Sequence, residues 1–402
     1  MNSQTDAIEL KTLLENPEQR IHEFPITATK IFLAHAAMSP FSHRTAKAIN
    51  EYVNKVSSEG QWEYLYADAE TGARRYAAEM LGAETNEIAF VSSTSMGLSM
   101  IAAGIDWEPG DNIIIADGDF PSNIYPWLNL EKQRVMVKFI PRNEDGIVTL
   151  EDITRLADEN TRLVSLSTVN YVSGYRIDVR AIGEYLQRKN ILFCLDAIQS
   201  LGVFPIDTTY VDFLAAGANK WLMGPVGIGI LYVKKKNINK INPVLAGWKC
   251  VQDNHNYVCY NLNFTESAKR FEPGSVSLTG IVGLNAALKL LLEVKIQHIA
   301  DRLTKFRKMM APALREKGYH VLGSENQGTI SGITSFTAET QEIMELHQKL
   351  DTGGIVISLR DGLSGEKCIR AAPHFYNTEE EIERFLDNVP RVSKQKIYAM
   401  TK

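Results

Sequence analysis

The feature that most constrains the fold is a repeated alternation of short apolar runs with amphipathic stretches in the middle of the chain. The runs DNIIIAD, RVMVKFIP, TRLVSLSTV and ILFCLD lie between residues 111 and 196, and helical patterns such as VTLEDITRLADEN and RAIGEYLQRKN lie between them. Each run is almost continuously Ile, Val, Leu or Phe, so both faces of these strands are expected to be buried. The pattern predicts an α/β fold with a mainly parallel sheet flanked by helices.

The pattern of expected helices and strands changes after GLNAALKLLLEV, which ends at Val294. A long amphipathic helix is expected over about 298–317, followed by short strands around GTISGITSFT and IVISLR. A last helix is expected in FYNTEEEIERFLDNV, with Asn377 as N-cap and Glu380 three residues on. For a chain of 402 residues we predict an N-terminal segment over 1–25, a large α/β domain over 26–290 and a smaller α+β domain over 291–402.

Composition and charge argue against several classes of protein. The formal net charge of −5 gives no basic surface for nucleic acid, and no apolar run approaches the length of a membrane span. The first twenty residues lack the apolar core of a signal peptide. Four cysteines without metal-ligand spacing suit a reducing cytoplasm and no structural metal. We therefore expect a cytoplasmic protein with no nucleic-acid or membrane partner.

Lys220 raises a question about chemistry, because it stands in AAGANKWLMGPVGIGILYV, a largely apolar and glycine-rich stretch that leads into a strand. A buried ammonium group is costly unless something uses or neutralises it. One interpretation is a lysine at a strand end whose amine reaches out to water. The other is an amine kept partly dry so that it is nucleophilic, as in a lysine that forms a Schiff base.

Ligands of open parallel sheets bind at the carboxyl ends of the strands, and polar or aromatic residues follow these apolar runs. Hydroxyls at a helix N-terminus can hold a phosphate or only cap the helix. Asp196 and Lys220 can form a salt bridge across two strand ends, or they can bind pyridoxal phosphate, with the carboxylate on its ring nitrogen and the amine on its aldehyde. The residues concerned are Ser92, Ser93, Thr94, Ser95, Asp119, Phe120, Asn170, Asp196, Gln199 and Lys220.

At these residues the sequence resembles a known family. DAIQ at 196–199, NKWLMGPVGIGILYV at 219–233, FEPGS at 271–275 and RAAPHFYNTEEEI at 370–382 are similar to motifs of the class V aminotransferases, the cysteine desulfurase-like pyridoxal phosphate enzymes of fold type I. The likeness runs from about LAHAAMSP at 33–40 through nearly the whole chain. Within the family it is most similar to the isopenicillin-N-epimerase-like and selenocysteine-lyase-like branch.

The resemblance assigns roles to the residues that match the motifs. It implies that Lys220 forms the Schiff base and moves the Cα proton, and that Asp196 pairs with the pyridinium nitrogen. Arg370 matches the arginine that binds the substrate carboxylate through a bidentate fork. Ser275 matches a residue that reaches the phosphate of the second subunit, which implies a homodimer. The remaining matches are cofactor-binding positions: Gln199 toward the phenolic oxygen, Thr94 and Ser95 on the phosphate, and Asn170 near a cofactor oxygen and the substrate.

Three departures from the family pattern bear on the reaction. The residue that stacks on the cofactor ring is commonly histidine, and here it is Phe120, which can stack but cannot move protons. The histidine commonly found before the lysine is Asn219, which leaves Asn219 as a cofactor-binding position with different chemistry. Desulfurases carry a catalytic cysteine on a longer loop, whereas Cys368 lies two residues before Arg370 in an expected strand. Desulfuration by a mobile cysteine is therefore disfavoured.

Several functions remain open on the sequence. The first is a pyridoxal phosphate enzyme acting at Cα or Cβ of an α-amino acid by transamination or a related elimination. Its alternatives are cleavage of a C–S bond, as in cysteine or selenocysteine lyases, and amino-acid epimerisation. A binding module that keeps the fold without catalysis is a third class, which the retained Lys220, Asp196, Gln199 and Arg370 oppose. A dinucleotide-binding protein is rejected, because the glycines of GPVGIG do not have the G-x-G-x-x-G spacing and they precede a strand rather than open a helix.

Overall fold

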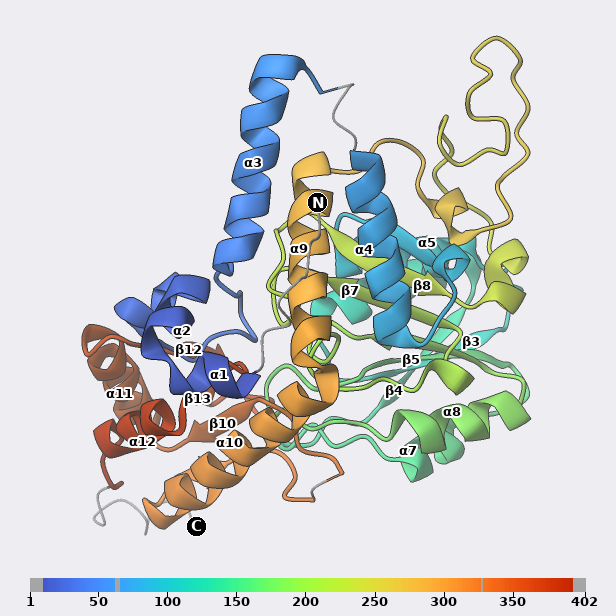
Figure 1. The fold of residues 1–402 in the computed structure, drawn as a ribbon. Coiled ribbons are helices and arrows are strands. Elements are labelled where there is room, and N and C mark those ends of the chain that lie inside the picture. Colours follow the sequence, from blue (N-terminus) through green and yellow to red (C-terminus); the bar gives the residue numbers. More distant parts are fainter. Residues whose placement is uncertain (1–9, 62–65, 327, 393–402) are drawn as a thin grey trace.

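A seven-stranded sheet lies at the centre of the protein (Figure 1), whose computed structural model describes residues 10–61, 66–326 and 328–392. The strand order is β2-β8-β7-β6-β5-β3-β4, and β8 alone runs antiparallel to its neighbours. The predicted mainly parallel sheet is therefore confirmed. The strands are β2 (Ile88–Val91), β3 (Asn112–Ala116), β4 (Met136–Ile140), β5 (Thr161–Ser167), β6 (Leu192–Asp196), β7 (Phe213–Gly217) and β8 (Gly229–Val233).

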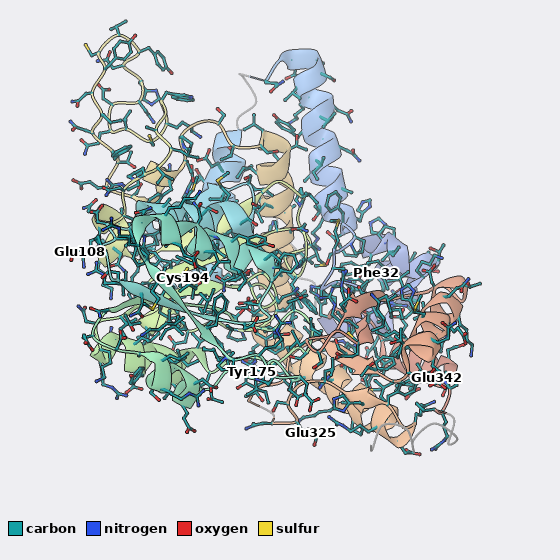
Figure 2. The ribbon with its side chains drawn as sticks, turned by 180° about the vertical axis from the view of Figure 1, so that it is seen from behind. Phe32, Glu108, Tyr175, Cys194, Glu325 and Glu342 are labelled. Carbon is teal, nitrogen blue, oxygen red and sulfur yellow. The ribbon has the colours of Figure 1, made fainter. Side chains whose placement is uncertain are left out.

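Helices cover both faces of this sheet, as the unbroken apolar runs predict. Successive residues of a strand enter different clusters: Phe193 and Leu195 of β6 pack in one core and Cys194 packs in the other. One core includes residues of α4 (Tyr66–Leu81), α7 (Leu150–Leu156), α8 (Val179–Arg188) and α9 (Leu278–Val294). The other includes residues of α5 (Thr94–Gly104) and α6 (Tyr125–Leu128). Figure 2 shows Cys194 among the strands, seen from behind.

A second, antiparallel sheet forms the C-terminal part of the chain. Its order is β12-β13-β10-β9, from β9 (His320–Val321), β10 (Thr334–Thr337), β12 (Ser358–Asp361) and β13 (Lys367–Ala371). The helices of this part are α10 (Ile296–Glu316), α11 (Thr340–Thr352) and α12 (Glu379–Asn388). The predicted cap of α12 is wrong by one residue, because Thr378 is the N-cap and forms the capping box with Glu381. Asn377 is instead buried, and its side-chain oxygen accepts the backbone N–H of His374.

Residues near the start of the described chain pair with the C-terminal part. After α1 (Leu10–Glu15) and α2 (Pro17–Glu23), β1 (Ile31–Phe32) pairs in parallel with β11 (Ile355–Val356). Ala34 continues this contact as a bridge to Ala372. These pairings bring residues 31–34 beside the C-terminal part, and the predicted division at residues 25 and 290 stays a prediction.

Two segments project from the body (Figure 1): the far end of α3 (His43–Glu59), in blue, and the excursion over 251–264, in yellow. The excursion closes at its base, where Val251 bridges Phe264. Over the described residues, no helix has the length and apolar character that crossing a membrane requires.

Candidate active site

The predicted site residues gather where the strands of the central sheet end. β8 is antiparallel to both β2 and β7, so β2 ends at the same edge as β5, β6 and β7. α5 starts at Thr94, just after β2, and the Thr94 hydroxyl oxygen accepts the backbone N–H of Gly217 at 2.9 Å. Asp196 is the last residue of β6, and Lys220 follows β7 by three residues. One sheet edge therefore holds Thr94, Asp196 and Lys220.

A tight turn over 218–224 presents Lys220. The N–H of Met223 donates to the Lys220 carbonyl at 2.9 Å, and the N–H of Gly224 donates to that of Ala218 at 2.8 Å. Met223 has φ of 52°, in the left-handed region that non-glycine residues rarely occupy, so backbone strain is stored beside the lysine. Lys220 Nζ lies 5.4 Å from the centre of the Phe120 ring.

Burial lowers the pKa of the Lys220 ammonium group, and the positive charges of Arg370 and Arg360 lower it further. The negative charge of Asp196 opposes these effects. A lowered pKa increases the neutral fraction of the amine, and only the neutral amine can attack an aldehyde or accept a proton. Lys220 is thus suited to nucleophilic and base chemistry.

Asp196 is a buried carboxylate with few partners of its own. Only 2% of its surface is exposed, and one oxygen accepts the backbone N–H of Ile198 at 3.0 Å. Burial raises its pKa, the neighbouring charge of Asp119 raises it further, and the charge of Lys220 lowers it. A carboxylate in this position favours a cationic partner, because a positive charge within hydrogen-bond reach offsets its desolvation. The protonated ring nitrogen of pyridoxal phosphate is a partner of that kind.

Asp119 fixes the segment that carries Phe120. Its buried carboxylate accepts hydrogen bonds from Phe120 N at 2.7 Å, Asn123 Nδ2 at 2.9 Å, and the backbone N–H and hydroxyl of Ser167 at 3.1 and 2.6 Å. The ring of Phe120 is 41% exposed and meets Tyr171 edge to face, with 5.3 Å between ring centres. An aromatic face therefore remains open beside Lys220, as stacking on a flat cofactor requires.

Arg370 lies in the middle of β13 with a guanidinium group that is only partly used. The residue is 2% exposed, and Nη1 donates to the carbonyl of Tyr171 at 2.5 Å. Its Nε is buried and has no hydrogen-bond partner within the described parts of the chain. Burial lowers the pKa of Arg370, and the charge of Arg360 lowers it further. A buried cation with a spare donor fits an anion such as a carboxylate.

Arg360 is a site residue that the sequence analysis missed. In the β12–β13 register Arg370 is opposite Ser358, and Arg360 is opposite Cys368, so both arginines lie on the same face of this sheet. Two cations in diagonal positions repel each other unless an anion lies between them. The sequence feature that could have identified Arg360 is the alternation in SLRD, because it places Ser358 and Arg360 on one face of the strand.

Gln199 and Asn170 are largely engaged by their own surroundings. Gln199 Oε1 accepts the indole N–H of Trp221 at 2.7 Å, and its Nε2 donates to the Ala36 carbonyl at 3.1 Å. One amide hydrogen of Gln199 remains for a ligand. Asn170 Oδ1 accepts the N–H groups of the loop residues 172 and 173 at 2.9 and 3.0 Å, which leaves its Nδ2 group as the ligand donor.

Three further predicted residues lie in different surroundings. The Asn219 carbonyl accepts the N–H of Ser39 at 2.9 Å, which ties the turn to the segment after β1. Ser95 shares a hydrogen bond of 2.7 Å with Ser122 near the start of α5. Ser275 is exposed and lines a separate hollow of about 840 Å³ together with Tyr52 and Trp248. The structure does not bring Ser275 to the other predicted residues.

Cys368 has the properties of a core residue. It has 0% exposed surface, and burial raises its pKa to about 12, with Glu366 adding to the effect. A thiol with that pKa is almost entirely protonated at neutral pH, and the thiolate is the reactive form. The short connection over 362–366 joins β12 to β13 beside a hollow of about 590 Å³, which Asp119, Tyr171 and Leu363 help to line.

Comparison with known proteins agrees with this geometry. The family model described as aminotransferase class-V matches residues 31–385. An uncharacterized aminotransferase of Bacillus subtilis is 30% identical over 376 residues, which are 93% of this chain and 97% of that protein. A probable cysteine desulfurase of Pyrococcus abyssi is 28% identical over 92% of this chain and 96% of its own length. The solved apo structure of cysteine desulfurase from Thermococcus onnurineus NA1 has a TM-score of 0.84 and 26% identity, covering 92% of this chain and 96% of that one.

Proposed function

This chain belongs to the aminotransferase class-V family, and from that premise we propose that Lys220 is the residue that binds pyridoxal phosphate. The protein is a pyridoxal phosphate-dependent enzyme of fold type I that acts at Cα or Cβ of an α-amino acid. The observation that carries the residue assignment is the position of Lys220: a half-buried amine with a lowered pKa, in a strained turn beside Asp196 and an open aromatic face.

The other residues at the sheet edge suit the parts of this cofactor. Asp196 would hold the ring nitrogen protonated, and the remaining amide hydrogen of Gln199 would donate to the phenolic oxygen. Thr94 and Ser95 are the first residues of the eleven-residue helix α5, where free backbone N–H groups and the helix dipole favour a phosphate. Phe120 would cover one face of the ring.

The cofactor, once bound, withdraws electrons from the substrate Cα and so makes its proton acidic. Lys220 accepts this proton as a neutral amine and can return it, which the lowered pKa favours. Arg370 binds the α-carboxylate through its spare donors and so orients the Cα–H bond toward the lysine. Because Lys220 and Arg370 are shielded from solvent, water is excluded and these charge interactions are stronger.

The class of reaction follows from what these residues lack. Phe120 has no group that can donate or accept a proton, so it cannot act as a general acid. Cys368 is buried and protonated, so it cannot act as the nucleophile that accepts sulfur. We therefore place the enzyme with those that move one Cα proton by a lysine, in transamination or a related elimination. Epimerisation would need a second acid on the opposite face of Cα, and Phe120 cannot serve as one.

A second candidate is elimination of a sulfur or selenium leaving group from Cβ, which the likeness to the probable cysteine desulfurase supports. In this reaction the Cα proton leaves to Lys220, and the electron pair of the Cβ–S bond departs with the sulfur. No cysteine of this chain has to attack. This candidate is compatible with a buried Cys368.

We propose a homodimer in which Ser275 reaches the phosphate site of the second subunit. Ser275 lies far enough from its own sheet edge to line a different hollow. Large apolar side chains lie exposed nearby on the projecting excursion, where Figure 2 shows the side chains directed outward. Exposed apolar groups of this kind mark association surfaces. On the excursion these are Tyr257, Val258, Tyr260 and Leu262, with Tyr260 being 96% exposed, and Trp248 is exposed just before it.

We also propose a cytoplasmic location. The four cysteines at positions 194, 250, 259 and 368 are all free, as expected in a reducing compartment. Cys259 is exposed on the projecting excursion, and Cys250 is buried just before its base, and the two are not paired.

The test of the proposed function is a visible absorption spectrum of the purified protein, followed by product analysis. A band from lysine-linked cofactor that changes when an α-amino acid is added supports the proposal. An oxo acid without sulfide indicates transamination, and sulfide or selenide indicates elimination. A protein that shows no such band after incubation with pyridoxal phosphate contradicts the assignment of Lys220.

A further inference from the structure

Two buried histidines lie between the lysine turn and the strand that carries Arg370, and the proposed function does not use them. His35 and His374 both have 0% exposed surface, and their rings lie 5.1 Å apart. His374 follows Arg370 by four residues, and its Nε2 is 3.0 Å from the carbonyl oxygen of Trp221, the residue after Lys220. One hydrogen bond thus connects the turn that carries Lys220 to the segment that follows Arg370.

The partners of each ring fix its tautomer. His374 Nδ1 accepts the N–H of Phe375 at 2.8 Å, so the ring proton is on Nε2, which donates to the Trp221 carbonyl. His35 Nδ1 faces the carbonyl of Ala372 at 2.8 Å and must donate, so its Nε2 accepts the Tyr376 hydroxyl at 2.7 Å. Both imidazoles are neutral in this arrangement, and both use their two nitrogens fully.

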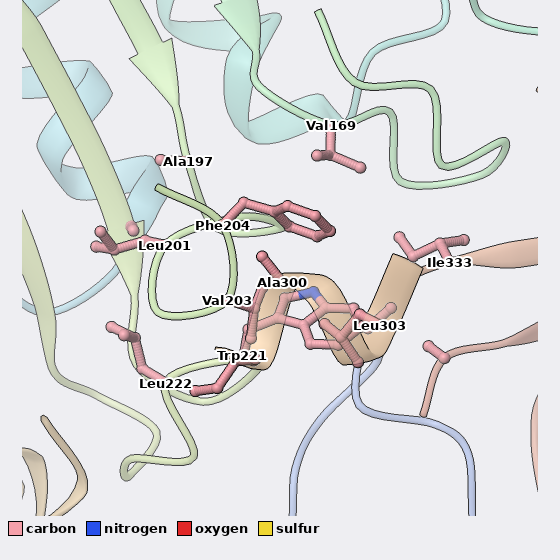
Figure 3. Close-up of a cluster of buried hydrophobic side chains, with 14 of the residues drawn as sticks. Val169, Ala197, Leu201, Val203, Phe204, Trp221, Leu222, Ala300, Leu303 and Ile333 are labelled. Carbon is pink, nitrogen blue, oxygen red and sulfur yellow. The ribbon is translucent and has the colours of Figure 1, made fainter. Parts of the chain in front are cut away.

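Trp221 is fixed at both ends. Its carbonyl accepts from His374, and its indole N–H donates to Gln199. Figure 3 shows its ring against Ala300 and Leu303 of α10, in a cluster that also holds Ile333 of the C-terminal part. The Cβ of any side chain at position 332 would lie 2.9 Å from the Trp221 ring, so only glycine leaves room for the ring there. Trp221 therefore contacts the C-terminal part and is also the residue next to Lys220, so a shift of the C-terminal part would move Lys220.

We infer that His374 is a positioning residue, whose hydrogen bond to the Trp221 carbonyl sets the place of Lys220 relative to Arg370. This inference rests on the proposed function, in which the two residues act on the same substrate. Lys220 and Trp221 are adjacent along the chain, and three residues separate Arg370 from His374. The turn at Lys220 is strained at Met223, so it relaxes when an external restraint is lost.

The amide side chains of glutamine and asparagine make a matched pair of variants. Glutamine places an N–H near the position of Nε2, so His374→Gln can still donate to the Trp221 carbonyl. Asparagine is shorter and mimics only the Nδ1 side of the ring, so His374→Asn removes this hydrogen bond. His374→Leu removes the same donor with a similar volume and no new buried polar group, and it replaces the asparagine variant if that variant does not fold.

The first measurement is amide hydrogen exchange over residues 219–224, which requires no cofactor. We expect faster exchange at the N–H groups of Met223 and Gly224 in His374→Asn or His374→Leu, and wild-type exchange in His374→Gln. The second is steady-state kinetics of the loaded enzyme. We expect kcat to fall at least about tenfold in the variants without the donor, since small misplacements of reacting groups are costly. KM should change by less than about threefold, because Arg370 and its Tyr171 contact are intact.

The third measurement is a pH titration of the visible band of the bound cofactor, which a residue with only a structural role would not shift. Release of the turn would change the distances from Lys220 to Asp196, Arg370 and Arg360, whose charges act on its pKa, so the apparent pKa of the visible band should shift in the variants without the donor. The inference is wrong if glutamine and asparagine variants lose kcat equally, or if exchange over 219–224 is unchanged in both. A wild-type protein without a visible band contradicts the proposed function alone, because the exchange comparison still decides whether His374 holds the turn.

Discussion

Asp196 and Lys220 act on each other's pKa values across a gap that no hydrogen bond bridges among the described residues. The charge of Asp196 raises the pKa of Lys220, and the charge of Lys220 lowers the pKa of Asp196, while burial works against the charged form of each. A direct salt bridge between them, the alternative left open by the sequence, is absent from the contacts of these two residues. Two buried opposite charges held apart leave room for a group that contacts both.

Replacement of Lys220 tests which amine carries the cofactor. Lys220→Ala should lose the visible band of the lysine-linked cofactor and all detectable turnover, because Lys220 supplies the amine beside Asp196 and Phe120. The thermal unfolding temperature should stay within a few degrees of wild type, since the lysine makes no hydrogen bond that the fold requires. Lys234→Ala, at the residue after β8, is the matched control and should keep the band. An unchanged band in Lys220→Ala would assign the cofactor to another residue.

Replacement of Asp196 tests the contact with the ring nitrogen. Asp196→Asn should still bind cofactor but lose turnover by at least about 100-fold, because a neutral amide does not hold the nitrogen protonated. The measurement is kcat together with cofactor content by absorbance. Asp207→Asn, which changes an exposed helix cap, controls for loss of a carboxylate. Turnover within a few-fold of wild type in Asp196→Asn would show that Asp196 does not contact the ring nitrogen.

Arg370 should recognise the α-carboxylate of the substrate through its fork of donors. Arg370→Lys keeps the charge but not the fork, so kcat/KM should fall by roughly 30-fold to several thousand-fold, for a loss of about 2–5 kcal/mol. The comparison is kcat/KM for an amino acid and for its decarboxylated amine, in wild type and variant. We expect the amine to be poor in the wild type and the discrimination to shrink in Arg370→Lys. Equal rates for acid and amine in the wild type would remove Arg370 from this role.

Cys368 should be dispensable for the reaction. Cys368→Ala should keep kcat/KM within about twofold of wild type, because the thiol is buried and its pKa is raised to about 12. A modest loss of stability, on the order of 1 kcal/mol, is expected from the small cavity that remains. Sulfide release measured beside oxo-acid formation checks the result. If sulfide release were lost while the visible band persisted, a persulfide mechanism through Cys368 would be restored.

The sequence predicted the central sheet because its signals are local. Runs such as NIIIA and LFCLD are buried on both faces, and each needs no knowledge of its neighbours to be recognised as a strand. The polar residues at the ends of these strands were found for the same reason, since parallel strands end at one edge. Thr94, Asp196 and Lys220 therefore came together as expected.

The contributions of distant segments were not predictable in the same way. Arg360 and Arg370 share a face because β12 pairs with β13 in one particular register. That register cannot be derived from the local sequence pattern. His35 and Tyr376 are 341 residues apart and meet only when β1 joins the C-terminal part. The cap of α12 was misplaced because Asn377 and Thr378 are both good caps, and the buried contacts of Asn377 decide between them.

The neutral state of His374 should make stability depend on pH. Burial lowers the pKa of His374 to about 4, from 6.5 as an ordinary value, and the hydrogen bond to Trp221 opposes this only in part. Between pH 6.5 and about 4 the unfolded chain binds a proton at this position that the folded protein does not. The free energy of unfolding should therefore rise with pH through this window and level off above it, at up to about 1.4 kcal/mol per pH unit for this residue.

His374→Gln isolates this contribution, because glutamine does not titrate while the carboxyl groups of the protein are the same in both proteins. The measurement is the free energy of unfolding by urea at half-unit steps from pH 4.5 to 7.5. The difference between wild type and variant should change steadily below pH 6.5 and be constant above it, in favour of the variant as the pH falls. His35 remains in both proteins; burial lowers its pKa and a charge on His374 lowers it further, so the difference reports His374 together with its coupling to His35. A difference that is flat over the whole range would mean that His374 takes up its proton as readily in the folded protein as in the unfolded chain.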